Sequence, residues 1–174
     1  MLVDSHGRKV SYLRLSITDR CNLRCLYCRP QDDWVFIPHQ DILSYEEMFE
    51  LVDAARHAGV EKIRLTGGEP FARKDFIPFV ARLHRAFPEL DLRITTNATM
   101  LEGRVAAIHD AGVVCLNISL DTLVRKKFEQ ITGVDAYDRV RSGIDACLRQ
   151  GLRVKVNVVA LKGVNDGELP GFVD

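Results

Sequence analysis

Three cysteines lie within eight residues of one another, in the segment TDRCNLRCLYCRP at residues 18–30. Cys21, Cys25 and Cys28 are separated by three residues and then by two. Thiolate sulfur binds zinc and iron–sulfur clusters, and three thiolates can hold three irons of a cubane cluster while the fourth iron stays open. The spacing therefore predicts a metal centre with one coordination position free for a ligand.

Two other interpretations of these thiols stay open. A structural zinc site needs a fourth ligand, for which His39 is the nearest candidate, and no second cysteine pair follows at finger spacing. A disulfide with one odd thiol requires an oxidising compartment, but the N-terminal sequence MLVDSHGRKV has no apolar run of signal-peptide length. Cys115 lies in a predicted strand and Cys147 on the apolar stripe of a predicted helix, so we expect both in the core.

Composition places the chain among ordinary globular proteins. Its 174 residues suffice for one domain with a core, and 24 Lys and Arg balance 24 Asp and Glu. This balance gives no reason to expect nucleic acid or a membrane surface as a partner. No apolar stretch approaches the roughly 20 residues of a membrane span. We therefore expect a cytoplasmic protein with neither kind of partner.

The elements that must position the cysteines follow from the hydrophobic pattern. Predicted strands lie at 12–18, 62–67, 92–97, 114–120 and 153–161, and predicted helices at 43–59, 75–88, 101–112 and 135–151. Ser44 and Glu47 predict a capping box for the first helix. This order predicts an α/β protein with a parallel sheet and helices packed outside it. The cysteines then follow the first strand, at the end of the sheet where parallel barrels build their active sites.

The alternation within the strands predicts two different faces of the sheet. Ile63 and Leu65, for example, alternate with polar neighbours such as Arg64. A closed eight-stranded barrel fills its interior with apolar side chains, so a polar inner face favours an open or partial barrel that holds a ligand. Several cations fall on this predicted face and favour an anionic substrate such as a phosphate: Arg14, Arg64, Arg93 and Lys155. The alternative is a sheet whose polar side simply faces water.

A second motif, TGGEP at residues 66–70, follows the second predicted strand. Together with CxxxCxxC and the aromatic Tyr27 before the last cysteine, it resembles the radical S-adenosylmethionine (SAM) superfamily. The resemblance implies that the three cysteines bind one 4Fe-4S cluster, whose open iron chelates SAM. It also implies one-electron cleavage of SAM to a 5′-deoxyadenosyl radical, with an electron donor such as flavodoxin or ferredoxin. The implied fold is a partial (β/α)6 TIM-like barrel, here incomplete with five strands.

The resemblance also implies contacts with SAM. Gly67 and Gly68 would let the backbone approach it, because no side chain blocks that approach. Glu69 would accept a hydrogen bond from its amino group. The full set of expected cofactor-binding residues is Tyr27, Gly67, Gly68, Glu69, Asn117 and Ser119. Taken alone, GGEP would be a plain strand-to-helix turn, and the polar residues at the third and fourth strand ends would be a hydrated wall.

The flanking sequence resembles one branch, the GTP 3′,8-cyclase family, which catalyses the first step of molybdenum cofactor biosynthesis. The matching segments are YLRLSITDRCNLRCLYC, EKIRLTGGEP, ITTNATML, LNISLDTL and VKVNVVALKGVND. The resemblance implies GTP as substrate, bound by Arg14, Arg64, Thr95 and Lys155. Arg93 shares their predicted face, but no family role is carried over to it.

The chain departs from the family pattern in three respects. Ala98 stands where glycine is usual, and Arg29 where methionine or leucine is usual. The family also carries a second three-cysteine cluster in a C-terminal region, and this chain ends at Asp174. We therefore expect residues 1–174 to be a truncated radical SAM core domain.

Three interpretations of the short chain follow. It is a fragment of the cyclase, a compact radical SAM enzyme acting on another small molecule or peptide, or an inactive remnant or subunit. In the last case the unpaired strand at 153–161 would pair with another chain, as in a homodimer.

Overall fold

The structure, a computed structural model, describes residues 2–28 and 35–173, so Arg29 lies outside the described residues. Five strands form one parallel sheet in the order of the sequence. They are β1 (Tyr12–Ser16), β2 (Lys62–Thr66), β3 (Asp91–Thr96), β4 (Cys115–Ser119) and β5 (Arg153–Asn157). In the described part of the chain β1 and β5 are the two edges, so the sheet is open. The predicted parallel α/β sheet is thus confirmed, with strands that end earlier than the sequence pattern suggested.

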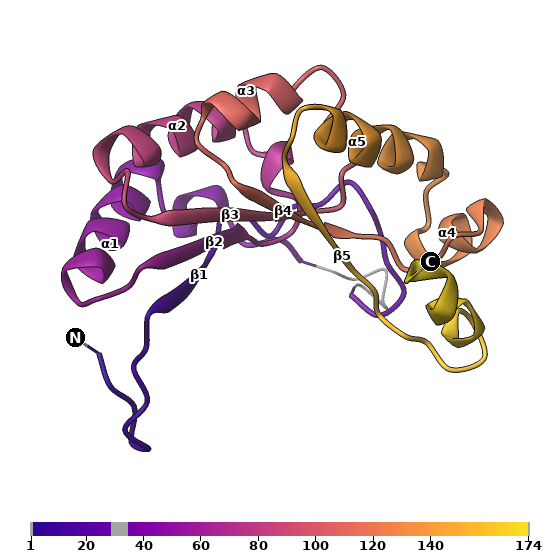
Figure 1. Cartoon of the computed structure of the whole chain (residues 1–174), viewed down its shortest axis with the longest axis horizontal. Helices are drawn as coiled ribbons and strands as arrows, with labels where there is room; N and C mark the ends of the chain where they lie inside the picture. The colour runs from indigo at the N-terminus through magenta and orange to yellow at the C-terminus, as the bar shows by residue number, and fades with distance from the viewer. Residues whose placement is uncertain (1, 29–34, 174) are drawn as a thin grey trace.

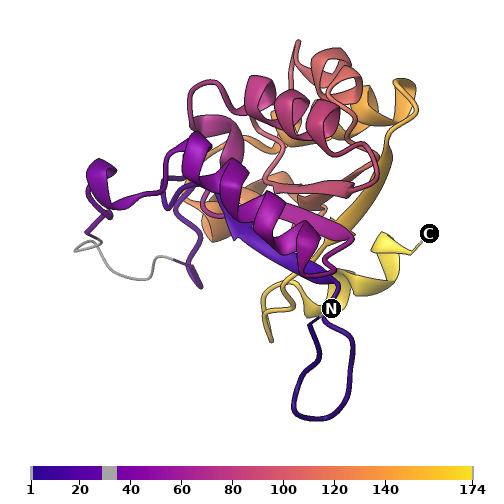
Figure 2. The same cartoon turned by 90° about the vertical axis from the view of Figure 1, so that its left-hand side faces the viewer.

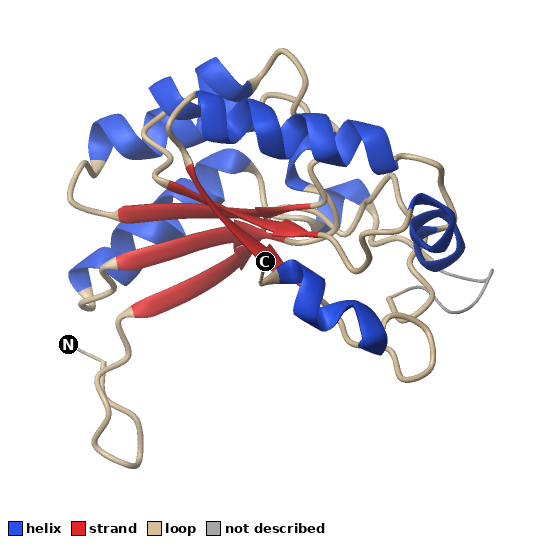
Figure 3. Ribbon diagram, turned by 45° about the vertical axis from the view of Figure 1, so that its right-hand side comes forward, coloured by secondary structure: helices blue, strands red, loops and turns tan. Residues whose placement is uncertain are grey.

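Helices cover one face of this sheet. The α-helices are α1 (Tyr45–His57), α2 (Phe76–Ala86), α3 (Val105–Asp110), α4 (Arg125–Thr132) and α5 (Tyr137–Arg149). The described residues also form the short 3-10 segments η1 (His39–Asp41), η2 (Pro70–Ala72) and η3 (Asp166–Phe172). Figure 1 shows α1, α2, α3 and α5 along one side of the sheet, and Figure 3 shows the strands open on the other side. Among the described helices, none has the length and apolar composition needed to cross a membrane.

The apolar half of each central strand forms the core beneath the helices. These side chains are at most 1% exposed: Ile63, Leu65, Leu92, Ile94, Leu116 and Ile118. Burying a side chain of this size contributes about 1.5–3 kcal/mol relative to leaving it in water. The helices therefore cover this face, and the polar half of each strand is left on the other one.

The first helix begins as predicted. The backbone N–H of Glu47 donates to Ser44 Oγ at 3.2 Å, and the backbone N–H of Ser44 donates to Glu47 Oε2 at 2.7 Å. This reciprocal capping box satisfies two N–H groups that would otherwise lack partners at the helix start.

The sequence pattern missed one helix, and its prediction for β5 held only in part. Helix α4 was not predicted, because its eight residues RKKFEQIT carry a short apolar stripe, with Phe128 and Ile131 as its buried apolar side chains. The alternation predicts Val154, Val156 and Val158 on the helix side of the last strand. Val154 packs against the core, but Val156 is 41% exposed because β5 is an edge strand.

The N-terminal residues lie away from the cysteine segment. Residues 2–10 form a loop that projects from the body in Figure 2, with an antiparallel bridge between Val3 and Lys9. Asp4 Oδ1 accepts hydrogen bonds from the backbone N–H groups of His6 and Arg8. This loop precedes β1, whereas the cysteines follow it, so the two lie at opposite ends of that strand.

Candidate active site

The structure brings the cysteine triad and the glycine pair to one cavity. This cavity has a volume of about 300 Å³ and lies at the C-terminal end of β1. It is lined by Ser16, Thr18, Asp19, Cys21, Leu23, Cys25, Cys28, Gly67 and Gly68. Ser16 shares its face of β1 with Arg14 because side chains two apart in a strand point the same way, so the cavity adjoins the polar face.

The three thiols of the triad share this cavity. Among the described residues, no group of three His, Cys, Asp or Glu side chains is placed to hold a single metal ion. A zinc site would draw its sulfurs to about 2.3 Å from one ion. A cubane takes one thiolate on each of several irons, so its ligands stand further apart. His39, the nearest candidate for a fourth zinc ligand, lines a different cavity. With three thiols and no described histidine in the cavity wall, the triad has the ligand number of a cluster with one open iron and not of a four-ligand zinc site.

The unpredicted helix α4 supports the cysteine segment. The backbone N–H groups of Arg24 and Leu26 donate to the carbonyls of Thr132 and Ile131 at 2.8 and 2.9 Å. These carbonyls belong to the last turn of α4, which has no later helical N–H to bond them. The end of one helix thus fixes the backbone between Cys21 and Cys28.

Asp121 also anchors the cysteine segment, through a hydrogen bond with Tyr27. The hydroxyl of Tyr27 donates to Asp121 Oδ2 at 2.6 Å, while Oδ1 accepts from the backbone N–H of Val159 at 2.9 Å. Burial, with Asp121 adding to it, raises the pKa of Tyr27. Burial first and Asp121 second raise the pKa of the Cys25 thiol to about 11. Cys25 is therefore protonated at neutral pH before metal binds, and a metal must displace that proton.

Sequence reasoning missed Asp121. Its position just after β4, in the segment SLDTL, was a usable signal, because strand ends gather at the active-site edge of a parallel sheet.

The glycine pair packs against the chain itself. Backbone N–H groups of Gly68 and Glu69 donate to the carbonyls of Thr18 and Arg20 at 2.6 and 2.8 Å. A Cβ at Gly67 would lie 2.3 Å from the Thr18 carbonyl oxygen, and one at Gly68 would lie 2.2 Å from that of Arg20. We predicted close approach of a ligand here. The structure shows that the backbone just before Cys21, at Thr18 and Arg20, also lies close to the glycine pair.

The Glu69 carboxylate joins the ends of β2 and β3. It is fully buried, and Oε1 accepts from the Phe71 N–H at 3.1 Å and the Thr96 hydroxyl at 2.8 Å. Oε2 accepts from the backbone N–H of Asn97 at 2.7 Å. Burial raises the pKa of this carboxyl, while the hydrogen bonds and Arg104 oppose that rise. Its expected contact with SAM stays a prediction.

Glu69→Gln is expected to lower the free energy of unfolding by about 1–3 kcal/mol. The two carboxylate oxygens each face a backbone N–H, and an amide has only one acceptor oxygen, so one N–H loses its partner. Urea denaturation measures the change. Glu102→Gln, on an exposed residue, is the matched control. Equal stability of the two variants would contradict this role of Glu69.

Ala98, the departure from the usual glycine, has a left-handed backbone. Its φ is 60°, and its side chain is fully buried. Glycine adopts this conformation without the steric cost that a Cβ brings, which is about 1–2 kcal/mol. The preference for glycine at this position therefore has a local physical reason.

Cations line the polar face, but they are not equivalent. Arg14, Arg64 and Arg93 lie in one register row across β1, β2 and β3. Arg93 forms an ion pair with Asp91 at 2.6 Å, because residues two apart in a strand share a face, and this pair lowers the pKa of Asp91. Within the described chain, Arg14 and Arg64 have no acidic partner within 4.0 Å. The guanidinium groups of both lie within 6 Å of the Tyr12 ring centre.

The remaining predicted residues lie further along the same face. Thr95, Asn117 and Lys155 are register partners across β3, β4 and β5, and Ser119 pairs with Asn157. The buried Asn117 Oδ1 and Arg64 Nε have no hydrogen-bond partner among the residues that the structure describes. These groups share the polar face, but the wall of the cysteine cavity does not include them.

Comparison with known proteins decides the family. The sequence model of the radical SAM protein family matches residues 15–174 of this chain. The chain belongs to the radical SAM superfamily. A 4Fe-4S cluster and SAM are the cofactors that characterise this family. The three cavity cysteines and the adjacent glycine pair of this radical SAM chain fit those cofactors.

The chain is also similar to curated proteins that are named GTP 3′,8-cyclase. A GTP 3′,8-cyclase from Sulfurovum sp. is 47% identical over 169 residues, which are 97% of this chain and 52% of that protein. A GTP 3′,8-cyclase from Campylobacter jejuni is 48% identical over 174 residues, which are 100% of this chain and 54% of that protein. The chain therefore spans about half the length of the curated relatives it matches.

Solved structures share the radical SAM fold. Streptococcus suis SuiB bound to S-adenosylmethionine has a TM-score of 0.76 and 21% identity, over 94% of this chain and 35% of that one. Methylornithine synthase has a TM-score of 0.69 and 20% identity, over 88% of this chain and 45% of that one. At such low identity these likenesses concern the fold alone, and they confirm the partial TIM-like barrel.

The other two cysteines of this radical SAM chain are core residues, as predicted. Cys115 and Cys147 are both fully buried. Burial raises the pKa of the Cys147 thiol to about 11, so it stays protonated at neutral pH.

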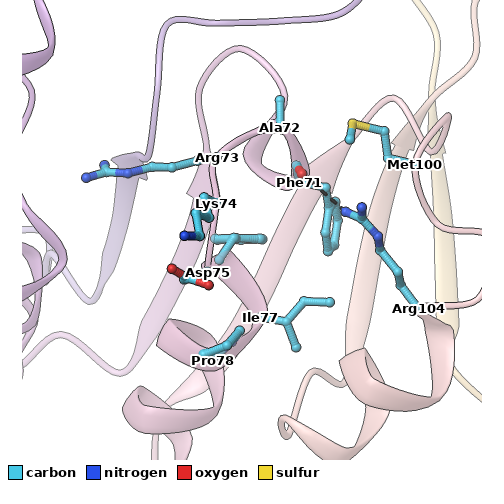
Figure 4. A pocket seen from close by; sticks show the side chains of 10 residues that line it. Phe71, Ala72, Arg73, Lys74, Asp75, Ile77, Pro78, Met100 and Arg104 are labelled. Atoms are coloured by element: carbon cyan, nitrogen blue, oxygen red, sulfur yellow. Dashed lines mark hydrogen bonds between the residues drawn. The ribbon is translucent and has the colours of Figure 1, made fainter.

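A separate cavity of about 410 Å³ lies behind the TGGEP turn, between η2, the start of α2 and Met100 (Figure 4). Its wall includes none of the predicted site residues. In this cavity Arg104 Nη1 donates to the Phe71 carbonyl at 3.3 Å. Arg104 therefore supports η2 from the side away from the cysteine cavity.

Proposed function

We propose that this chain is the SAM-cleaving core of a GTP 3′,8-cyclase, the enzyme that rearranges GTP in the first step of molybdopterin biosynthesis. The single observation that carries the proposal is the cavity shared by the cysteine triad and the glycine pair. It adjoins a polar face with two arginines that have no acidic partner among the described residues. Identity near 48% to named cyclases supports GTP over other substrates.

The chain's own residues would divide the work as follows. Cys21, Cys25 and Cys28 would hold the cluster. When bound, the cluster supplies one electron to SAM and so generates a hydrogen-abstracting radical. Residues around the cavity and along the polar face would hold SAM: Tyr27, Gly67, Gly68, Glu69, Asn117 and Ser119.

Tyr27 can orient a cofactor because Asp121 fixes its hydroxyl. On the polar face, Arg14, Arg64, Thr95 and Lys155 would hold GTP, whose triphosphate suits the donor fork of arginine. Arg64 Nε and Asn117 Oδ1, which have no partner in residues 2–28 and 35–173, are a donor and an acceptor that bound ligands could satisfy.

The substrate, electron donor and compartment belong to this proposal. A flavodoxin or ferredoxin would supply the electron, and the five free cysteines suit the reducing cytoplasm. Residues 1–174 would form the radical SAM core. The chain spans about half of its relatives, and we propose that residues 1–174 load one cluster and cleave SAM.

Anaerobic reconstitution with iron and sulfide tests the proposal. We expect one 4Fe-4S cluster per chain and release of 5′-deoxyadenosine from SAM after reduction with dithionite. Chromatography of the products, with and without GTP, measures this. A fully loaded chain that leaves SAM intact would contradict the proposed activity.

GTP binding tests the substrate assignment. We expect Arg64→Ala to weaken binding of GTP about tenfold or more, because it removes a charged hydrogen-bond donor. Arg85→Ala, on the exposed side of α2, is the matched control. Calorimetric titration that finds no difference between the two variants would favour another substrate, such as a peptide.

A further inference from the structure

The sulfur of Cys21 receives hydrogen bonds from two N–H groups. The backbone nitrogen of Leu23 lies 3.5 Å from Cys21 Sγ, and Nδ2 of Asn97 lies 3.6 Å from it. Asn97 is 8% exposed and directly follows β3. A buried side chain from another strand end thus reaches the first cysteine of the triad.

A ring of side chains fixes the orientation of the Asn97 amide. Its Oδ1 accepts from the backbone N–H of Thr99 at 3.0 Å and from the Thr99 hydroxyl at 2.6 Å. Its Nδ2 also donates to Asn22 Oδ1 at 3.0 Å, and Asn22 Nδ2 donates to Thr99 Oγ1 at 2.7 Å. A backbone N–H only donates, so the amide atom that faces it must be oxygen. The NH₂ end of Asn97 therefore faces Cys21.

We propose that Asn97 is a positioning residue that holds the Cys21 sulfur and raises the reduction potential of the cluster through its N–H···S hydrogen bond. The inference rests on the proposed function, because it requires a cluster on Cys21. It assigns to Asn97 a task distinct from direct contact with SAM or GTP.

The expected rise in potential follows from the negative charge that the cluster gains on reduction. One electron passes from a one-electron carrier, which is oxidised, to the cluster, which is reduced, and no bond forms or breaks. The added negative charge spreads onto the sulfur ligands, so an N–H donor on sulfur stabilises the reduced form more than the oxidised form. At 8% exposure little water screens this interaction, which makes it stronger than at the surface.

Three variants of the full 174-residue chain test the inference. Asn97→Ala removes the donor, and Asn97→Asp keeps the shape but turns a carboxylate oxygen toward the sulfur. Thr99→Val removes a hydroxyl from the ring but keeps the backbone N–H that orients Asn97. Each chain is reconstituted, its iron and sulfide are measured, and its midpoint potential is determined by redox titration monitored by electron paramagnetic resonance.

We expect Asn97→Ala to lower the equilibrium constant for one-electron reduction about tenfold, which is about 59 mV in potential. Asn97→Asp should lower it further, and Thr99→Val should change it less than Asn97→Ala does.

Several results would overturn the inference. Equal potentials in wild-type and Asn97 chains that carry equal clusters would do so. So would a Thr99→Val shift as large as that of Asn97→Ala, because general loosening would then explain both. Loss of the cluster from both Asn97 variants but not from Thr99→Val would show a purely structural role. Failure of the wild-type chain to take up any cluster is a different result, and it would refute the proposed function itself.

Discussion

Cys25→Ala is expected to abolish assembly of the 4Fe-4S cluster, whereas Cys147→Ala is expected to leave it intact. Cys25 lines the cavity with the other two thiols of the triad, and its loss leaves a cubane with only two of its three cysteine ligands. Cys147 is fully buried on α5, among apolar side chains. Iron and sulfide content after anaerobic reconstitution, with the visible absorbance of the cluster, measures the difference.

The control variant has a cost of its own. Removing the buried Cys147 sulfur leaves a small cavity, which lowers the free energy of unfolding by about 1 kcal/mol. Reconstitution at low temperature keeps both variants folded, and circular dichroism verifies it. Equal cluster loss in the two variants would mean that the triad is not the ligand set.

Gly68→Ala is expected to destabilise the chain by about 3 kcal/mol or more and to prevent cluster assembly. The new Cβ would lie 2.2 Å from the Arg20 carbonyl oxygen, and backbone atoms cannot move aside as a flexible side chain can. Relief of the clash must separate the TGGEP turn from residues 18–20 and so displace Cys21. Thermal denaturation and iron content measure the two effects.

Gly167→Ala is the matched control for this change. A Cβ at Gly167 has nothing within 4 Å, and its backbone lies outside the left-handed region, so alanine is tolerated there. A Gly68→Ala chain as stable as Gly167→Ala, with a full cluster, would show that the glycine pair is not required for packing against the cysteine segment.

Local patterns predicted much of this molecule. Strand positions, the open parallel sheet and the capping box of α1 follow from periodicity and from residues within a few positions of each other. The joint cavity of the cysteines and the glycine pair was also predictable, because consecutive parallel strands end at the same edge.

The remainder depended on contacts between distant residues or on features too weak to detect. Tyr27 and Asp121 are 94 positions apart, and no spacing rule joins them. The apolar stripe of α4 is too short to predict a helix, yet its last turn holds the cysteine segment. The pairing of Arg93 with Asp91 was open to prediction from alternation, since both fall on one strand face.

The anchoring of the cysteine segment by α4 and Asp121 has a consequence for the order of events during biosynthesis. The cysteines leave the ribosome early, but their backbone partners at residues 131 and 132 and the Asp121–Val159 link are synthesised more than 100 residues after Cys21. The ligands therefore reach their final arrangement only after Val159 has been synthesised. Delivery of iron and sulfide must follow that point, and a nascent chain that ends before it would present three loose thiols to oxidation in place of a prepared site.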